Sequence, residues 1–369
     1  MTANGEVPAL EPADHELVAR VNATLAEYLD IRAEELGRVH PCVAEAGEAL
    51  VEFTRGGKRI RPTFAWWGWR GAGGDPSSPE ADAVLRAVSA LELVQANALV
   101  HDDLMDASLT RRGRPTVHVE FAARHRKSDW RGDPDRFGDA VAILLGDLAL
   151  AWADDMFYGT DLAPSALRRA QPVWAGLRTD MVGGQYLDVW SQATAARDED
   201  TALRVNRFKT AAYTIERPLQ LGGAIAGAHP DLEAAYRRFG TELGIAFQLR
   251  DDQLGVFGDP EVTGKPAGDD IREGKRTVLM ALASAAAERR GDRVSSQALD
   301  SALGDPDLDE NGVDRIRSLL TDLGASTEIE HRIERLTESA LAALGEVSIP
   351  EPAATALARL AVSATRRQA

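Results

Sequence analysis

Apolar residues recur every three or four positions along almost the whole chain, and this spacing restricts the possible folds more than any other feature. Within residues 15–36, Leu17, Val21, Leu25 and Leu29 follow one another at intervals of four. That interval places them on one face of an α-helix. Alternation with a period of two, which would indicate strands, is nearly absent, and the good helix former alanine is abundant. The sequence therefore predicts an all-α protein.

Further helices are expected wherever the same spacing returns. These stretches are 81–106, 137–158, 164–188, 200–227, 231–257, 275–290, 296–303, 312–323, 327–345 and 351–367. No long polar linker separates them, so one all-helical domain is expected over residues 15–369. Residues 1–14, which contain glycine and two prolines, are expected to form a flexible leader.

The charge and the cysteine content exclude several classes of protein. The chain has 42 Lys and Arg against 58 Asp and Glu, a net charge of −16. A nucleic-acid binder needs a basic face, so this class is disfavoured. Cys42 is the single cysteine, which excludes an internal disulfide framework and a multi-cysteine zinc site. No signal peptide and no run of 18 apolar residues is found, so a cytoplasmic protein without a transmembrane segment is expected.

Three carboxylates gather at the end of the predicted helix 81–106. Asp102, Asp103 and Asp106 are spaced by three and four residues, so they lie on neighbouring turns of one helix face. Their mutual repulsion and the helix dipole destabilise this helix end unless a cation neutralises it. Such hard oxygen ligands suit Mg²⁺, which keeps waters and bridges to phosphates. Taken alone, however, a motif this short is more often a solvated acidic helix end.

A second acidic cluster, Asp251 and Asp252, also ends an apolar helix, with Gln248 one turn earlier on the same face. The next position on that face is Gly255 rather than a third carboxylate, and Asp259 follows one turn later. Two such clusters are much less expected by chance than one. If the two helices face each other, the clusters wall a cavity for several metal ions and a diphosphate.

Basic residues are interleaved with the acidic clusters and are candidates for holding a phosphorylated substrate. In residues 56–62, two flexible glycines precede Lys58 and Arg61, which offers backbone N–H groups and an arginine fork to an anion. The others are Arg111, Arg112, Lys209 (followed by Thr210), Lys265, Lys275 and Arg276. Each one alone is more often a surface charge, but together, in so acidic a chain, they favour an anionic substrate.

A pair of glycines stands in the predicted helix 164–188. Gly183 and Gly184 come just before Gln185 and Asp188. Glycine permits another backbone or a ligand to come close. A simple packing contact between helices explains the pair equally well.

Taken together, these segments resemble the trans-type polyprenyl (isoprenyl) diphosphate synthases. The segments GGKRIRP, HDDLMD, RRGRPT, GDLAL, GQYLD, KTAAYT and FQLRDDQLGVFGD, followed by GKPAGDDIREGKRT, occur in the order of that family. The segments RGDPDRFG and DDQLGVFGDP are most similar to the corresponding segments of the actinobacterial geranylgeranyl diphosphate synthases. The resemblance implies a helical bundle around a central cavity, Mg²⁺ as the cofactor and a homodimer.

The resemblance also implies a role for each matching residue. The Mg²⁺ ligands would be Asp102, Asp103, Asp106, Asp251 and Asp252. The groups that bind isopentenyl diphosphate would be Lys58, Arg61 and Arg112. The groups around the allylic diphosphate would be Arg111, Lys209, Lys265 and Lys275. Thr210 and Gln248 would flank the carbocation, and Gln95, which stands where the family often has histidine, would donate to a phosphate.

The implied reaction joins isopentenyl diphosphate to an allylic diphosphate (dimethylallyl, geranyl or farnesyl) after metal-assisted ionisation of the allylic C–O bond. The family sets product length mainly at the positions four and five before the first aspartate, here Ala98 and Asn97. Both are small, which favours a C20 product over C15, while C25 or longer stays open. Helix geometry places Ala98 near the face of Asp102, whereas Asn97 points largely away.

Two other functions were weighed. A class I terpene cyclase also uses a DDxxD cluster, but it needs an Asn/Ser/Glu metal triad that FQLRDDQLGVFGD does not supply. A regulatory subunit usually loses one or both clusters, whereas this chain has both. Lys58, Arg61 and Arg112 are moreover useful only if a second diphosphate binds, so a chain-elongating prenyltransferase, making geranylgeranyl diphosphate, is the preferred interpretation.

Overall fold

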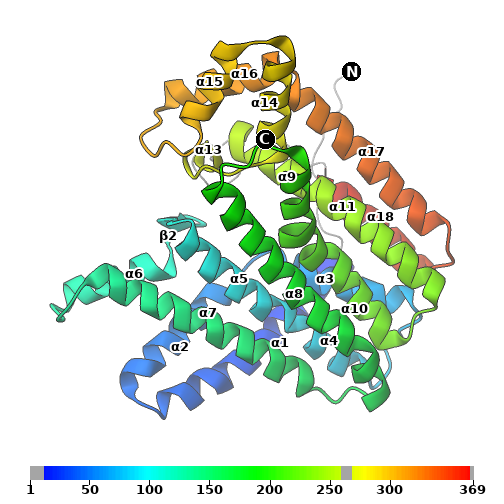
Figure 1. Cartoon of the computed structure of the whole chain (residues 1–369). Coiled ribbons are helices and arrows are strands. Elements are labelled where there is room, and N and C mark those ends of the chain that lie inside the picture. The colour runs from blue at the N-terminus through cyan, green and yellow to red at the C-terminus, as the bar shows by residue number, and fades with distance from the viewer. Residues whose placement is uncertain (1–11, 259–267, 366–369) are drawn as a thin grey trace. The chain divides into compact units, whose positions relative to one another are not determined.

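The computed structural model describes residues 12–258 and 268–365. Apart from one short two-stranded hairpin, the regular structure of these residues is helical (Figure 1), which confirms the all-α prediction. The chain clusters into two compact units, an N-terminal unit of Ala9–Ala175 with Pro218–His229 and a C-terminal unit of Gly176–Arg217 with Pro230–Ala369. The single domain expected over 15–369 stays a prediction. Of the expected leader 1–14, only the start of the first helix, from Pro12, is described.

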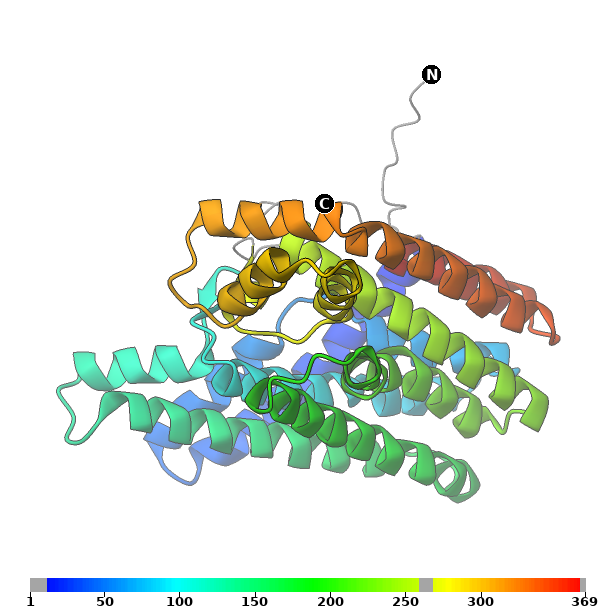
Figure 2. The same ribbon diagram turned by 45° about the horizontal axis from the view of Figure 1, so that its top comes forward.

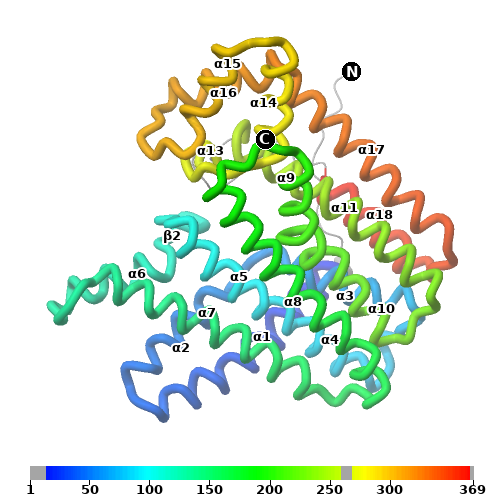
Figure 3. The backbone as a smooth tube through the Cα atoms, viewed as in Figure 1, coloured from blue at the N-terminus to red at the C-terminus, as the bar shows by residue number. Residues whose placement is uncertain are grey.

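The N-terminal unit is built from short and long helices. They and the hairpin strands are α1 (Pro12–Gly37), α2 (Pro41–Thr54), α3 (Ile60–Gly71), α4 (Ala81–Ser89), α5 (Leu91–Met105), β1 (Thr110–Arg111), β2 (Arg114–Pro115), α6 (Val117–Lys127), α7 (Pro134–Tyr158), the first part of α8 (Pro164–Ala193) and most of α10 (Arg217–Ala226). Helix α7 lies beside both α5 and α6 (Figure 3). Helix α5 is thereby held in place by α7, and it carries the first acidic cluster.

Aromatic stacking joins α7 to the first part of α8. The ring of Trp174 stacks on that of Phe157 with centroids 4.3 Å apart, and both rings are buried. The indole nitrogen of Trp174 donates a hydrogen bond of 2.7 Å to Asp154. Since the polar end of the buried indole is satisfied, the contact adds both apolar burial and a fixed orientation.

The most apolar stretch of the described chain, Ala81–Met105, covers α4 and α5. By length and composition it could cross a membrane, but 72% of its most apolar window is buried inside the protein. A core helix passes the same test. In this structure the stretch packs against α3 and α7, which is the position of a core helix.

The C-terminal unit has its own core. Its elements are the rest of α8, α9 (Glu199–Val205), the π-helix η1 (Asn206–Glu216), α11 (Pro230–Phe257), α13 (Asp269–Arg272), α14 (Val278–Arg290), α15 (Arg293–Ala302), α16 (Glu310–Asp322), α17 (Ala325–Gly345) and α18 (Glu351–Thr365). Helices α11 and α17 lie side by side (Figure 2). Leu249, Val278, Leu320 and Ile329, all fully buried, belong to one apolar cluster that joins α11, α14, α16 and α17.

Residues 206–216 form the π-helix η1 instead of continuing the predicted α-helix. Two neighbouring helices, α8 and α11, each pack a glycine closely against the backbone of η1. A Cβ at Gly184 of α8 would lie 2.2 Å from the Lys209 nitrogen, and one at Gly244 of α11 would lie 2.5 Å from the Ala211 Cα. Because no side chain keeps these backbones apart, both helices pack closely on η1. Helix propensity does not separate α from π turns, so the sequence could not predict this feature.

Candidate functional site

The first acidic cluster ends α5 and meets an arginine of the hairpin. Asp103 is buried, and the Nε of Arg111 donates to both of its carboxylate oxygens at 2.8 Å, while Nη2 lies 2.6 Å from Oδ1. Asp102 lies 3.8 Å from the same Nη2, with 19% of its side chain exposed. Asp106 follows the helix, and its backbone N–H donates to the Asp102 carbonyl. The hairpin therefore neutralises Asp103 and leaves Asp102 partly open to solvent.

The hairpin also brings a second arginine to the glycine loop. Arg112 has a left-handed backbone with φ of 52°. A Cβ on Gly57 would lie 3.3 Å from its Nη2, so the guanidinium rests against this glycine, next to Lys58. Desolvation, followed by the charges of Arg111 and Arg59, lowers the pKa of Arg112. Positive charge is thus crowded here, and a bound anion would relieve the repulsion.

A buried arginine anchors the glycine loop. Arg59 lies immediately before α3 with only 5% of its side chain exposed. It donates to Glu92 of α5 at 2.6 Å and to the Thr54 carbonyl, at the end of α2, at 2.7 Å. These bonds hold a left-handed backbone, with φ of 49°, at Arg59. The two predicted substrate-binding residues that flank it, Lys58 and Arg61, therefore start from a fixed backbone.

The two residues predicted to set product length differ in their surroundings. Asn97 is buried, and its Nδ2 donates 3.0 Å to the Gly146 carbonyl of α7. Its amide group is thus directed at α7. Ala98 is half-buried, one turn before Asp102, and Gln95 is half-buried on the same helix. Asn97 therefore joins two helices, whereas Ala98 shares the helix face of the first acidic cluster.

The second acidic cluster contains a buried carboxylate. Gln248 donates 2.6 Å to one oxygen of Asp252, and Asn206 of η1 donates 3.3 Å to the other. Burial, joined by the charges of Asp270 and Asp251, raises the pKa of Asp252 to about 7, although the two hydrogen bonds act to lower it. The contact with Asn206, 46 residues away in sequence, was not foreseen, because no local pattern signals it.

Asp252 should make the stability of the metal-free protein depend on pH. Its pKa is about 7 in the folded protein against an ordinary value of 3.8. Between these values the folded state binds more protons than the unfolded chain, so the free energy of unfolding falls as the pH rises. We expect a lower melting temperature in EDTA at about pH 8 than at about pH 5.5, and a smaller difference in Asp252→Asn. An equal difference in the variant would contradict this assignment.

The predicted lysine of η1 is paired with the predicted aspartate of α8. Lys209 Nζ lies 2.6 Å from the Asp188 carboxylate. The close approach at Gly184 brings these two elements together, so Gly184 marks a packing contact. A Cβ at Gly183 would meet nothing within 4 Å. Thr210 follows Lys209 on η1 and is half-buried.

The loop after the second cluster holds another of the predicted lysines. Lys275 Nζ lies 3.1 Å from Asp270 and 2.8 Å from Glu273. The predicted substrate-binding Lys265, like Asp259, lies outside the described residues.

The carboxylates fit a hard divalent cation. Within residues 12–258 and 268–365, no three His, Cys, Asp or Glu side chains are grouped closely enough to hold an ion by themselves. Mg²⁺ usually takes only one or two carboxylates and completes its shell with waters and substrate phosphates. The buried Asp252, whose charge is disfavoured beside Asp251 and Asp270, would be relieved by such a cation. Asp102 offers a partly exposed carboxylate for the same purpose in the N-terminal unit.

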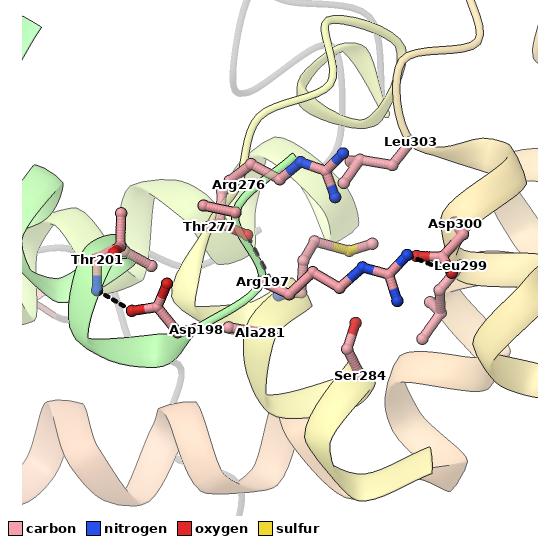
Figure 4. A pocket seen from close by; sticks show the side chains of 13 residues that line it. Arg197, Asp198, Thr201, Arg276, Thr277, Ala281, Ser284, Leu299, Asp300 and Leu303 are labelled. Carbon is pink, nitrogen blue, oxygen red and sulfur yellow. Dashed lines mark hydrogen bonds and ion pairs between the residues drawn. The ribbon is translucent and has the colours of Figure 1, made fainter. Parts of the chain in front are cut away.

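A small cavity in the C-terminal unit lies apart from these residues. Figure 4 shows Arg197 directed at Asp300, with Arg276 and Thr277 among the other lining residues. The Arg197 Nη2 lies 2.9 Å from the Asp300 carboxylate. Its volume of about 10 Å³ accommodates about one water molecule. It is too small for a diphosphate, and of the basic candidates named from the sequence that the structure describes, only Arg276 lines it.

Comparison with known proteins places the chain in a family. The family described as "Polyprenyl synthetase" matches residues 41–319. A crystal structure of geranylgeranyl pyrophosphate synthase from Corynebacterium glutamicum, complexed with isoprenyl diphosphate and magnesium, has a TM-score of 0.92 and 45% identity, covering 96% of this chain and 99% of that one.

Two further relatives are named for products of other lengths. A geranylfarnesyl diphosphate synthase of Aeropyrum pernix is 34% identical over 305 residues, or 82% of this chain and 87% of that protein. A (2E,6E)-farnesyl diphosphate synthase of Mycobacterium tuberculosis is 29% identical over 355 residues, or 96% and 92%. The family matches most of the chain, and the structure has the all-α fold with the two acidic clusters. This chain therefore belongs to the polyprenyl synthetase family.

Proposed function

We propose that this prenyltransferase condenses isopentenyl diphosphate with an allylic diphosphate, in a Mg²⁺-dependent reaction, to make geranylgeranyl diphosphate. The observation that carries the proposal is the presence, in one chain, of two acidic clusters and of basic groups for two diphosphates. A cyclase or a regulatory subunit has no use for the second set of basic groups. Arg112 resting on Gly57, beside Lys58, is the clearest part of that set.

The basic residues form two groups, one for the diphosphate of each substrate. The allylic diphosphate is assigned to Arg111, Lys209 and Lys275, each of which already neighbours a carboxylate. The second diphosphate is assigned to Lys58, Arg61 and Arg112, and Gln95 is assigned a phosphate contact. When bound, Mg²⁺ would supply the charge withdrawal that weakens the allylic C–O bond.

The side chains near the second acidic cluster orient the reacting carbons. Gln248, fixed by its bond to Asp252, and Thr210 on η1 are assigned to flank the positive charge on the allylic carbon. The double bond of isopentenyl diphosphate attacks that carbon, and a proton then passes to the departed diphosphate. No histidine or cysteine nucleophile is needed. Fixed charges and the exclusion of water account for the rate.

The product of the reaction is expected to be C20. Purified protein would be incubated with Mg²⁺, isopentenyl diphosphate and farnesyl diphosphate, and the dephosphorylated products sized by gas chromatography–mass spectrometry. Because Ala98 is small and lies on the face of Asp102, the growing chain passes this position, and geranylgeraniol should dominate. In Ala98→Phe the ring should block the passage, so that a reaction started from dimethylallyl diphosphate accumulates a C15 alcohol.

The same experiment separates the alternatives. A wild-type ladder reaching C25 or longer keeps the reaction but places the end of the chain beyond Ala98. No elongation with any allylic primer would refute the proposal. Asn97→Ala, at the other position that the resemblance links to product length, should in addition lower stability, since the Asn97 side chain donates to the Gly146 carbonyl.

We also propose that the enzyme is a homodimer and acts in the cytoplasm, where its single thiol, Cys42, stays reduced. Support for the dimer comes from the N-terminal unit, where Ile143 and Leu144 of α7 are 48% and 66% exposed. Exposed neighbouring apolar residues of this kind mark association surfaces. Light scattering should report a dimer for the wild type and a monomer for Leu144→Glu. Val294→Glu, also at an exposed position, is the control and should stay dimeric.

A further inference from the structure

The second acidic cluster lacks a side chain at the position where its helix face continues. Asp251 and Asp252 are followed on that face of α11 by Gly255. The space beside this glycine is nevertheless filled. A Cβ built on Gly255 would lie 2.0 Å from the Oδ2 of Asp270 and 2.8 Å from its Cγ. The carboxylate of Asp270 therefore occupies the volume that a side chain at 255 would take.

The backbone holds Asp270 in this position. Gly268, with φ of 83°, immediately precedes α13, and its N–H donates a hydrogen bond of 3.1 Å to the Gly255 carbonyl. The Lys275 N–H donates 3.0 Å to the Asp270 carbonyl. The Lys275 side chain also contacts Asp270, through Nζ and Oδ1. The second carboxylate oxygen, Oδ2, points at Gly255. The short helix is thus tied to α11 at the point where the carboxylate arrives.

We propose that Asp270 supplies, from α13, the third carboxylate of the second acidic cluster, and that Gly255 is the residue that makes room for it. The inference rests on the proposed function, since it assigns Asp270 to the binding of Mg²⁺ with a diphosphate. If only a side chain at position 255 could supply the third carboxylate, this chain would lack it, because residue 255 is glycine.

The test is an exchange of the two positions. Mg²⁺ would be titrated calorimetrically into protein with saturating inorganic diphosphate, a readout that needs no turnover. Asp270→Ala and Asp270→Asn should both weaken Mg²⁺ binding about 10- to 100-fold. The double variant Gly255→Asp with Asp270→Ala should return it to within about threefold of the wild type. Gly255→Ala with Asp270→Ala, which fills the space without a carboxylate, should stay as weak as Asp270→Ala.

A second control tests whether Asp270 acts by binding the metal or only by holding Lys275 in place. Glu273 is the other carboxylate beside Lys275, at 2.8 Å. Glu273→Gln should leave the Mg²⁺ titration unchanged. Three results would overturn the inference. The first is that Glu273→Gln weakens Mg²⁺ binding as much as Asp270→Ala does, and the second is that Asp270→Asn binds Mg²⁺ as tightly as the wild type. The third is that Gly255→Asp with Asp270→Ala binds Mg²⁺ no more tightly than Gly255→Ala with Asp270→Ala.

The inference and the proposed function can fail separately. If the wild type binds Mg²⁺ and diphosphate but makes no prenyl product, the function falls and Asp270 keeps its assignment. If the wild type elongates substrates and Asp270→Ala needs no more Mg²⁺ than the wild type, the function stands and the inference falls.

Discussion

Asp102→Asn should lower prenyl transfer roughly a thousandfold, because it removes several kcal/mol of charge stabilisation at the leaving diphosphate. Asp102 is half-buried, with 19% of its side chain exposed, and it lies farther from the Arg111 guanidinium than Asp103 does. Its neighbour Asp103 is buried and accepts three contacts from Arg111, whereas Asp102 lies 3.8 Å from that guanidinium. The amide of asparagine has nearly the same volume, so the fold should be kept. Initial rates at saturating substrates and varied Mg²⁺ would measure the loss.

A matched surface variant controls for a general effect of removing one acidic charge. Asp135 lies in the first turn of α7 and pairs with Arg126, with 71% of its side chain exposed. Such an exposed pair contributes little free energy, so Asp135→Asn should keep its activity within about twofold. Asp102→Asn retaining more than about a tenth of the wild-type rate would refute the assignment of this residue to the metal.

Local spacing was sufficient to predict most of the long helices, but α2, α3 and α6 lie outside the predicted stretches. Helix α3 is the clearest case. Its residues IRPTFAWWGWRG bury nine positions, with Phe64 and Trp69 among the largest fully buried side chains. A helix immersed in the core presents no apolar stripe, so its periodicity is invisible in the sequence. The stretches predicted to be helical therefore do not include α3.

The candidate residues were predictable one cluster at a time, because each cluster is local in sequence. The contacts between segments were not. Asn206 to Asp252 and Lys209 to Asp188 join positions 46 and 21 residues apart, and only the fold brings them together. The role of Gly255 illustrates the limit best. The sequence shows a missing carboxylate there, and only the structure shows that another carboxylate fills the space.

Gly184→Ala should destabilise the protein and reduce its activity, whereas Gly183→Ala should do neither. A Cβ at Gly184 would lie 2.2 Å from the Lys209 nitrogen and 2.6 Å from the Lys209 Cα, and a backbone cannot yield as a flexible side chain does. Helix α8 and η1 must therefore separate, which costs about 1–3 kcal/mol, as overpacking usually does. The separation also lengthens the 2.6 Å contact between Lys209 and Asp188, so the KM for the allylic diphosphate should rise.

The adjacent glycine makes this prediction sharp, because the two variants differ only in what the new methyl group meets. At Gly183 nothing lies within 4 Å, and alanine in a helix is favoured over glycine by up to about 1 kcal/mol. Urea unfolding should therefore show Gly183→Ala equal to or more stable than the wild type, and Gly184→Ala clearly less stable. Equal stabilities for the two variants would mean that α8 and η1 are not in close contact. A less stable Gly184→Ala with an unchanged KM would instead separate the packing of η1 from the placement of Lys209.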